Sequence, residues 1–180
     1  MAMKPGRHLR DRPPLDGETL EQAALGYAGR YATSRAKLRD YLLRKLRERG
    51  WAGAREPPVD ALVERMAKLG YVDDRAFASA RAAALGRRGY GERRVRDALR
   101  AAGIEEEDSA GACEAASRDA WAAALRFAQR RRIGPFASAQ ADRIGREKAL
   151  AAMLRAGHPA ELARRLIGAR PGQIPEADAP

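Results

Sequence analysis

The sequence predicts an all-α fold built from three tandem three-helix repeats. A glycine that ends a leucine-rich helical segment recurs at intervals of 53 and 54 residues, at Gly50, Gly103 and Gly157. Aromatic residues recur at intervals of 50 residues, at Tyr27, Phe77 and Phe127. No segment shows the alternation of apolar and polar residues that is typical of a strand. A fixed period of this size is typical of stacked helical units, because one small unit cannot bury its apolar face alone.

The first repeat, residues 18–70, carries three apolar stripes at helical spacing. The stripe of the first helix is Leu20, Ala24, Tyr27 and Tyr31. The second helix is capped by Thr33 or Ser34 and ends at Gly50. Its stripe is Leu38, Tyr41, Leu42 and Leu46. Pro57 and Pro58 open the third helix, which ends at Gly70. The inward residues of this helix are Val59, Leu62, Val63, Met66 and Leu69.

The second repeat, residues 71–117, begins with Asp73 as a helix N-cap and Asp74 in the positively charged first turn. The inward residues of this helix are predicted to be Phe77, Ala80 and Ala84. The glycine-rich loop GRRGYG follows. The next helix is predicted to bury Val95, Ala98, Leu99 and Ala102. That orientation places three arginines on the opposite side, Arg93, Arg96 and Arg100. The acidic run 105–108 suits the N-terminus of a third helix near residues 111–117.

The third repeat, residues 118–168, opens with a helix whose inward residues are Trp121, Ala124, Leu125 and Ala128. A long connection, 133–144, leads to a second helix with Leu150, Met153 and Leu154 inward. Residues 159–167 form a short last helix. The two ends of the chain carry no periodic pattern, so we expect residues 1–17 to be a disordered basic arm and residues 169–180 a disordered tail.

Charge is the strongest compositional signal. The chain has 35 lysines and arginines against 24 acids, a formal net charge of +11. This balance favours an anionic partner, most often nucleic acid. Arginine accounts for 30 of the 35 basic residues, a bias that a GC-rich genome also produces. A single cysteine excludes an intramolecular disulfide and fits a reducing compartment. We find no signal-peptide pattern and no apolar run long enough for a membrane span, so we expect a cytoplasmic protein without a membrane partner.

No constellation of residues predicts catalysis, a bound cofactor or a metal. Asp73 and Asp74 are paired carboxylates in a suggestive turn, but helix capping requires the same residues at this position. His8 and His158 have no cysteine or carboxylate cluster at ligand spacing. The GRRGYG loop lacks the preceding strand and the lysine with its Ser/Thr that a nucleotide-binding loop needs. We therefore expect a binding protein rather than an enzyme.

The basic surface is the candidate binding site. Arginines concentrate on the helix at 34–50 and in the second repeat, where few acids accompany them. The predicted binding residues are Arg35, Arg39, Arg47, Arg87, Arg88, Arg93, Arg96 and Arg100. Their guanidinium groups suit phosphate and carboxylate equally well. The alternative is a solvated helix face stabilised by pairs of opposite charge.

The span 70–104 contains GYVDDRAFA and the loop GYG followed by RRVRDALRAAGI, and SRAKL lies further upstream. In this order and spacing these segments resemble the RecX family of bacterial RecA regulators. The resemblance covers roughly residues 18–168. It implies tandem three-helix units in an elongated, curved array. It also implies a protein that lodges in the groove of the RecA filament on single-stranded DNA, and that inhibits or modulates RecA ATPase and strand exchange without being an enzyme itself.

Two functional hypotheses follow. The first is a monomeric regulator whose partners are the RecA filament and its single-stranded DNA, acting in DNA repair and recombination. The second is a helical DNA-binding protein that competes with the recombinase for DNA without contacting it, with Arg93, Arg96 and Arg100 along a groove. Against sequence-specific base reading, the chain has no asparagine, and its few glutamines lie away from this stripe.

Overall fold

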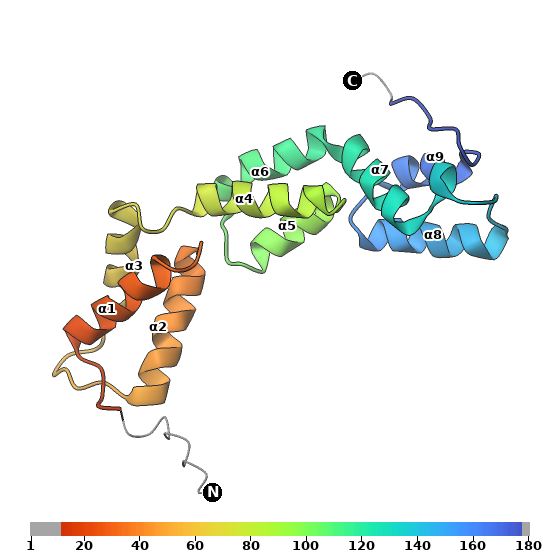
Figure 1. Cartoon of the computed structure of the whole chain (residues 1–180). Helices are drawn as coiled ribbons and strands as arrows, with labels where there is room; N and C mark the ends of the chain where they lie inside the picture. Colours follow the sequence, from red (N-terminus) through yellow and green to blue (C-terminus); the bar gives the residue numbers. More distant parts are fainter. Residues whose placement is uncertain (1–11, 178–180) are drawn as a thin grey trace, which may run out of the picture. The chain divides into compact units, whose positions relative to one another are not determined.

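The computed structural model describes residues 12–177 of the 180-residue chain, and helices dominate this part (Figure 1). The chain divides into two compact units, residues 1–77 and 78–180, and the division falls within α4 (Asp74–Arg87). Within residues 12–177 there is no strand beyond an isolated bridge between Leu15 and Trp51. The predicted all-α fold is confirmed. The repeat boundaries after residues 70 and 117 stay a prediction.

Within residues 12–77 the first unit contains three complete helices, α1 (Gly17–Ala28), α2 (Arg35–Arg49) and α3 (Val59–Lys68). Each presents one apolar side to a shared core, whose fully buried side chains are Leu15, Leu20, Ala24, Leu38, Leu42 and Met66. Asp16 begins α1 through a capping box with Thr19. Ser34, rather than Thr33, caps α2, because its hydroxyl accepts the Lys37 N–H at 3.2 Å.

Part of the predicted disordered arm, residues 1–17, is ordered in the structure. Residues 1–11 lie outside the described part of the chain, but Leu15 is fully buried. Its N–H donates to the Gly50 carbonyl at 3.0 Å, and its carbonyl accepts from the Ala52 N–H at 2.8 Å. The Arg49 guanidinium also donates to the Pro13 carbonyl at 2.7 Å. A short extended segment can bury one leucine without any helical period, so the sequence pattern contains no signal for it.

The second unit contains the remaining elements. They are the rest of α4, then α5 (Glu92–Arg100), α6 (Glu106–Arg118), α7 (Ala120–Arg131), the 3-10 helix η2 (Gly134–Phe136), α8 (Arg143–Arg155) and α9 (Ala160–Gly168). Helices α7, α8 and α9 enclose a core whose most buried side chains are Ala124, Ala128, Met153, Ala163 and Leu166. The part of the predicted tail that is described, residues 169–177, contains no helix, and the Gly172 N–H donates to the Pro135 carbonyl at 2.8 Å.

The end of the GRRGYG loop packs against the turn between α8 and α9 in the second unit. The Gly91 N–H donates to the Ala156 carbonyl at 2.9 Å, so the start of α5 lies against the turn between α8 and α9. Gly157 in that turn has φ +93°, and a Cβ at this position would lie 2.4 Å from the Arg94 nitrogen. All three periodic glycines, Gly50, Gly103 and Gly157, have positive φ. Gly91 and Gly157 therefore allow close backbone packing between the loop and this turn.

The inward face of α4 differs from the prediction. Ala78, Ala82 and Leu85 are buried, whereas Ala80 is exposed. Phe77, which anchored the predicted register, is half-buried, and the Lys37 Nζ lies 4.8 Å from its ring centroid. The true face begins one residue later than the aromatic ring. The position of Phe77 did not identify the buried face of this helix, because alanines occupy both its buried and its exposed face.

Candidate nucleic-acid interface

Two of the predicted binding arginines on α2 are paired with acids of the same unit. Arg39 Nε lies 2.6 Å from Asp60 Oδ1, and this hydrogen bond lowers the pKa of Asp60 and raises the pKa of Arg39. Arg35 lies 3.7 Å from Glu64 and 4.0 Å from Asp74. Exposed pairs of this kind are weak, but they cancel local charge. A partner would therefore meet less positive potential here than the sequence suggested.

The two adjacent aspartates have structural roles. Asp73 Oδ1 accepts the Ala76 N–H at 2.9 Å, which confirms the predicted cap of α4. Asp74 is buried, and its Oδ1 accepts the Arg35 N–H at 2.9 Å. The Asp74 carboxylate thus also satisfies a backbone donor in the first turn of α2. Sequence reasoning missed this second role, because the two residues are 39 positions apart.

The arginine stripe on α5 is exposed, as the helical pattern predicted. Arg93, Arg96 and Arg100 are exposed, while Val95 and Leu99 are buried. Each arginine also has a partner within the unit. Arg96 pairs with Glu92, Arg100 Nη1 lies 3.7 Å from Asp97, and Arg93 donates to the Leu154 carbonyl. The stripe is therefore partly neutralised by its own helix.

In the second unit, several arginines without a carboxylate partner among the described residues gather around Tyr90 and Phe127. We define the Tyr90 cluster as Arg87, Arg88, Tyr90, Arg130 and Arg131. The Arg88 and Arg130 guanidinium carbons lie 5.4 and 5.9 Å from the Tyr90 ring centroid. Arg130 and Arg131 lie 5.7 and 5.9 Å from the centroid of Phe127. Among the described residues, none of the four arginines has a carboxylate within 4 Å.

The Tyr90 cluster contains two predicted residues and two that sequence reasoning missed. Arg87 and Arg88 were predicted, and Arg130 and Arg131 were not. A signal was present in the run of three arginines that ends the helix at 120–131, where cations also favour the negative end of the helix. The fold brings the ends of α4 and α7 together around one aromatic ring. Interleaved arginine and aromatic side chains are typical of nucleic-acid-binding surfaces.

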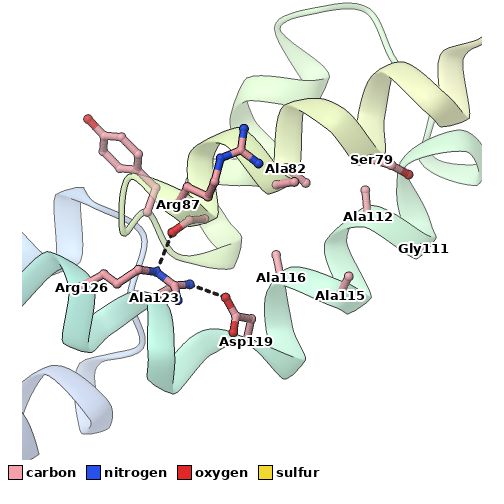
Figure 2. A pocket seen from close by; sticks show the side chains of 13 residues that line it. Ser79, Ala82, Arg87, Gly111, Ala112, Ala115, Ala116, Asp119, Ala123 and Arg126 are labelled. Atoms are coloured by element: carbon pink, nitrogen blue, oxygen red, sulfur yellow. Dashed lines mark hydrogen bonds and ion pairs between the residues drawn. The ribbon is translucent and has the colours of Figure 1, made fainter.

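An apolar hollow of about 660 Å³ lies beside the cluster, between α4, α6 and α7 (Figure 2). Six of its thirteen lining residues are alanines: Ala82, Ala83, Ala112, Ala115, Ala116 and Ala123. At one end Arg126 donates to the Gly86 carbonyl at 3.0 Å and pairs with Asp119. Arg126 thereby ties α7 to the end of α4. Asp119, the carboxylate in the wall, is engaged in this pair.

His158 is part of the packing rather than of a site. The residue is 3% exposed, and its Nε2 donates to the Gly89 carbonyl at 3.0 Å. Burial lowers the pKa of His158, and the hydrogen bond to Gly89 offsets part of that effect. Within residues 12–177 there is no group of three or more His, Cys, Asp or Glu side chains that could hold a metal. No helix in this range is long and apolar enough to cross a membrane.

Comparison with known proteins assigns the family. No protein-family model matches the sequence. Regulatory protein RecX of Myxococcus xanthus is 33% identical over 163 residues, covering 84% of this chain and 86% of that protein. This chain belongs to the RecX family. The RecX resemblance of the span 70–104 is thereby confirmed for most of the chain.

The RecX fold is supported by a solved structure as well. The crystal structure of RecX from Lactobacillus salivarius matches with a TM-score of 0.60, covering 83% of this chain and 93% of that one, at 17% sequence identity. At this identity the match supports the fold alone. Both relatives are named RecX, and the curated one is named a regulatory protein. The described residues of this RecX chain adopt the helical fold of the solved RecX structure.

Proposed function

We propose that this RecX protein regulates the RecA recombinase by binding the filament that RecA forms on single-stranded DNA. In this proposal it acts as a cytoplasmic monomer in DNA repair and recombination, and mainly inhibits RecA ATPase and strand exchange. The observation that carries the proposal is the 33% identity to a regulatory RecX over 84% of the chain. The net charge of +11 supports it, because the filament presents DNA phosphate.

We include all the predicted arginines in the proposed contact surface. We expect larger contributions from those without an ion-pair partner inside the protein. Arg87 and Arg88 stand first, together with the added Arg130 and Arg131, because no described carboxylate cancels their charge. Arg47 is exposed on α2, where the neighbouring Glu48 offsets part of its charge. Those with intramolecular partners stand second: Arg35, Arg39, Arg93, Arg96 and Arg100. A partner must break or share these ion pairs before it gains from them.

The proposed mechanism needs no chemistry from the protein itself. Arginines bound to phosphate or to acidic RecA surface would hold RecX on several protomers at once. Charge alone gives salt-sensitive attachment without preference for a filament. Preference for the filament must come from contacts repeated across protomers, since linked contacts raise affinity far beyond that of each one. Such a bound protein can obstruct strand exchange or slow the protomer motions that accompany ATP turnover.

Binding to bare and to RecA-coated single-stranded DNA tests this proposal. We expect the affinity for the coated strand to exceed that for the bare strand at the same salt concentration. Fluorescence anisotropy of labelled oligonucleotides, with RecA held on the strand by a slowly hydrolysed ATP analogue, measures both. Equal affinities would contradict filament recognition. They would favour the competing hypothesis, in which the protein removes DNA from RecA without contacting it.

A further inference from the structure

A second aromatic and basic surface lies in the first unit, between α1, the turn that follows it and α2. It borders a hollow of about 570 Å³ whose lining includes three tyrosines and three cations. The lining residues of interest are Tyr27, Tyr31, Tyr41, Arg30, Arg44 and Lys45. We name this surface the tyrosine hollow. None of its members is among the binding residues predicted from the sequence.

Tyr31 is the exposed member of the hollow. The sequence placed it on one helix face with Leu20, Ala24 and Tyr27, but α1 ends at Ala28 and Tyr31 lies beyond it. Its side chain is 59% exposed. A large aromatic ring in that position gains little from burial in the fold. The prediction that Tyr31 continues the apolar stripe is wrong, because Gly29 ends the helix one turn earlier.

The other two tyrosines of the hollow are held in place by packing. The rings of Tyr27 and Tyr41 are stacked at 4.2 Å with an interplanar angle of 13°, and both pack against the core of the unit. The Tyr31 ring lies 5.5 Å from Tyr27 at 51°. Tyr31 is thus held beside the stacked pair on one side. Its exposed surface remains available for another planar group.

The charge around the hollow is positive. The Arg44 guanidinium carbon and the Lys45 Nζ lie 5.5 and 5.8 Å from the Tyr41 ring centroid, so cation–π contacts hold both cations there. Glu48 pairs with both, at 3.0 Å from Lys45 and 3.8 Å from Arg44. Arg30 has no carboxylate within 4 Å among the described residues, and no carboxylate lines the hollow. The ligand that fits this surface is both planar and anionic.

We propose that the tyrosine hollow binds a nucleobase of single-stranded DNA on Tyr31, with the neighbouring phosphates on Arg30 and Arg44. Aromatic platforms with interleaved cations bind single strands in this way, because every base has a face to stack and every nucleotide has a phosphate. A duplex does not fit, since its bases are stacked on each other. This proposal rests on the proposed function for the source of the strand, the DNA within the RecA filament.

Two single-stranded probes, one with bases and one without, distinguish the contribution of base stacking to affinity from that of phosphate charge. The probes are an oligodeoxythymidylate of about 15 nucleotides and an abasic strand of the same length, which keeps the phosphates but has no bases. The full-length wild-type protein is expected to bind the thymidylate more tightly. Tyr31→Ala is expected to weaken thymidylate binding about 5- to 150-fold, the factor that corresponds to the loss of one stacked base. Its affinity for the abasic strand is expected to stay unchanged.

Three variants serve as controls. Tyr31→Phe keeps the ring and is expected to bind like wild type. Tyr71→Ala removes a tyrosine of the same unit that is 52% exposed but lies outside the hollow, and it too is expected to bind like wild type. Arg30→Gln is expected to weaken both probes alike and to reduce the slope of log affinity against log salt by about 0.7, the value for one lost phosphate contact on a single strand.

A direct probe locates the stacked base. A thymidylate strand carrying one 5-iodouracil, irradiated in complex with the full chain, is expected to crosslink to the peptide that contains Tyr31. Equal binding of thymidylate and abasic strands by wild type would overturn the proposal, and so would equal losses on both probes for Tyr31→Ala. Inhibition of the RecA ATPase is measured in parallel with the same variants. If Tyr31→Ala keeps both its DNA affinity and its inhibition of RecA, the proposal for the tyrosine hollow fails while the proposed regulation of RecA stands.

Discussion

The turn between α8 and α9 shows how single residues determine the packing of the second unit. Gly157 combines φ +93° with a backbone approach that leaves no space for a side chain. Gly91 faces it from the start of α5, and a Cβ on Gly91 would lie 2.5 Å from the Gly157 carbonyl oxygen. The neighbouring His158 reaches the Gly89 carbonyl at 3.0 Å. Residues of the GRRGYG loop and of this turn thus form one contact between α5 and α8.

Replacing Gly157 by alanine is expected to destabilise the second unit by about 2–5 kcal/mol. Left-handed backbone accounts for about 1–2 kcal/mol of this and overpacking for about 1–3 kcal/mol. Urea unfolding followed by Trp121 fluorescence in a Trp51→Phe background measures it. Gly111→Ala is the matched control, because Gly111 lies in α6, where an added Cβ would have no neighbour within 4 Å. It is expected to stabilise by about 0.5–1 kcal/mol, and equal effects of both substitutions would contradict the packing argument.

The burial of His158 predicts a loss of stability in mild acid. Its pKa in the folded protein lies below the ordinary value of 6.5, so the unfolded chain binds the proton more readily. As pH falls from 6.5 toward the folded-state pKa, the free energy of unfolding should decrease by up to about 1.4 kcal/mol per pH unit. Below the folded-state pKa the loss is complete. Urea titrations of wild type and His158→Gln between pH 7.5 and 5 should show a flatter dependence for the variant. Identical pH dependences would contradict this role of His158.

At the scale of elements, side chains that cap helix starts act mostly within their own helix, and one acid reaches a neighbouring helix. Asp16, Ser34 and Asp73 cap their own helices. Asp74 reaches across to the first turn of α2, where its buried carboxylate accepts the Arg35 N–H. A buried carboxylate with a charged and a backbone partner couples these two elements more strongly than an exposed ion pair does.

Asp74→Ala is expected to destabilise the first unit by about 1.5–3 kcal/mol, because it removes the buried carboxylate that accepts the Arg35 N–H. Urea unfolding followed by Trp51 fluorescence in a Trp121→Phe background reports on this unit. Asp60→Ala removes the exposed partner of Arg39 and is the comparison variant, for which we expect little change. If the Asp60 substitution proved as destabilising as that of Asp74, burial would not be the deciding factor.

Local signals in the sequence were enough to predict most of the helices. Capping residues, prolines and helix-ending glycines act within one turn, so a single sequence displays them. The errors arose where distant packing decides the outcome. Leu15 is buried through bonds to residues 50 and 52, α4 has alanine on both faces, and Tyr31 lies beyond a helix that ended early. None of these depends on a periodic pattern.

For the candidate interface, the sequence was enough to predict which arginines of α5 are exposed, but not which arginines form ion pairs with acids of the same protein. The helical period correctly placed Arg93, Arg96 and Arg100 on the solvent side of α5. The pairing of Arg35 and Arg39 with acids of other helices could not be seen, because Asp60 and Asp74 are distant in sequence. The Tyr90 cluster likewise depends on the ends of α4 and α7 meeting, which spacing alone does not show.

The Tyr90 cluster is expected to contribute more to DNA binding than the α5 stripe. Replacing Arg87, Arg88, Arg130 and Arg131 by glutamine should reduce the salt slope of single-stranded DNA binding by about 0.7 for each lost phosphate contact. The matched variant replaces Arg93, Arg96 and Arg100 by glutamine. Its effect should be smaller per arginine, because these side chains have partners within their own unit. Anisotropy titrations over a salt series measure both, and the reverse ranking would contradict the pairing argument.

At the scale of the whole molecule, a net charge of +11 is distributed over two units that each present an arginine and tyrosine surface. The Tyr90 cluster belongs to the second unit and the tyrosine hollow to the first. Two such surfaces on one chain suit a ligand that repeats along its length, as a nucleoprotein filament does. Membership of the RecX family points to the RecA filament as that ligand in our proposal.

The most direct test of this account is the single-stranded-DNA-dependent ATPase rate of the cognate RecA on preformed filaments. The protein is titrated well below one molecule per RecA protomer. The account predicts a clear fall in the rate in this substoichiometric range, because each bound molecule acts on a filament rather than on one stretch of bare DNA. A rate that stays constant until the protein saturates the DNA would contradict filament-directed regulation.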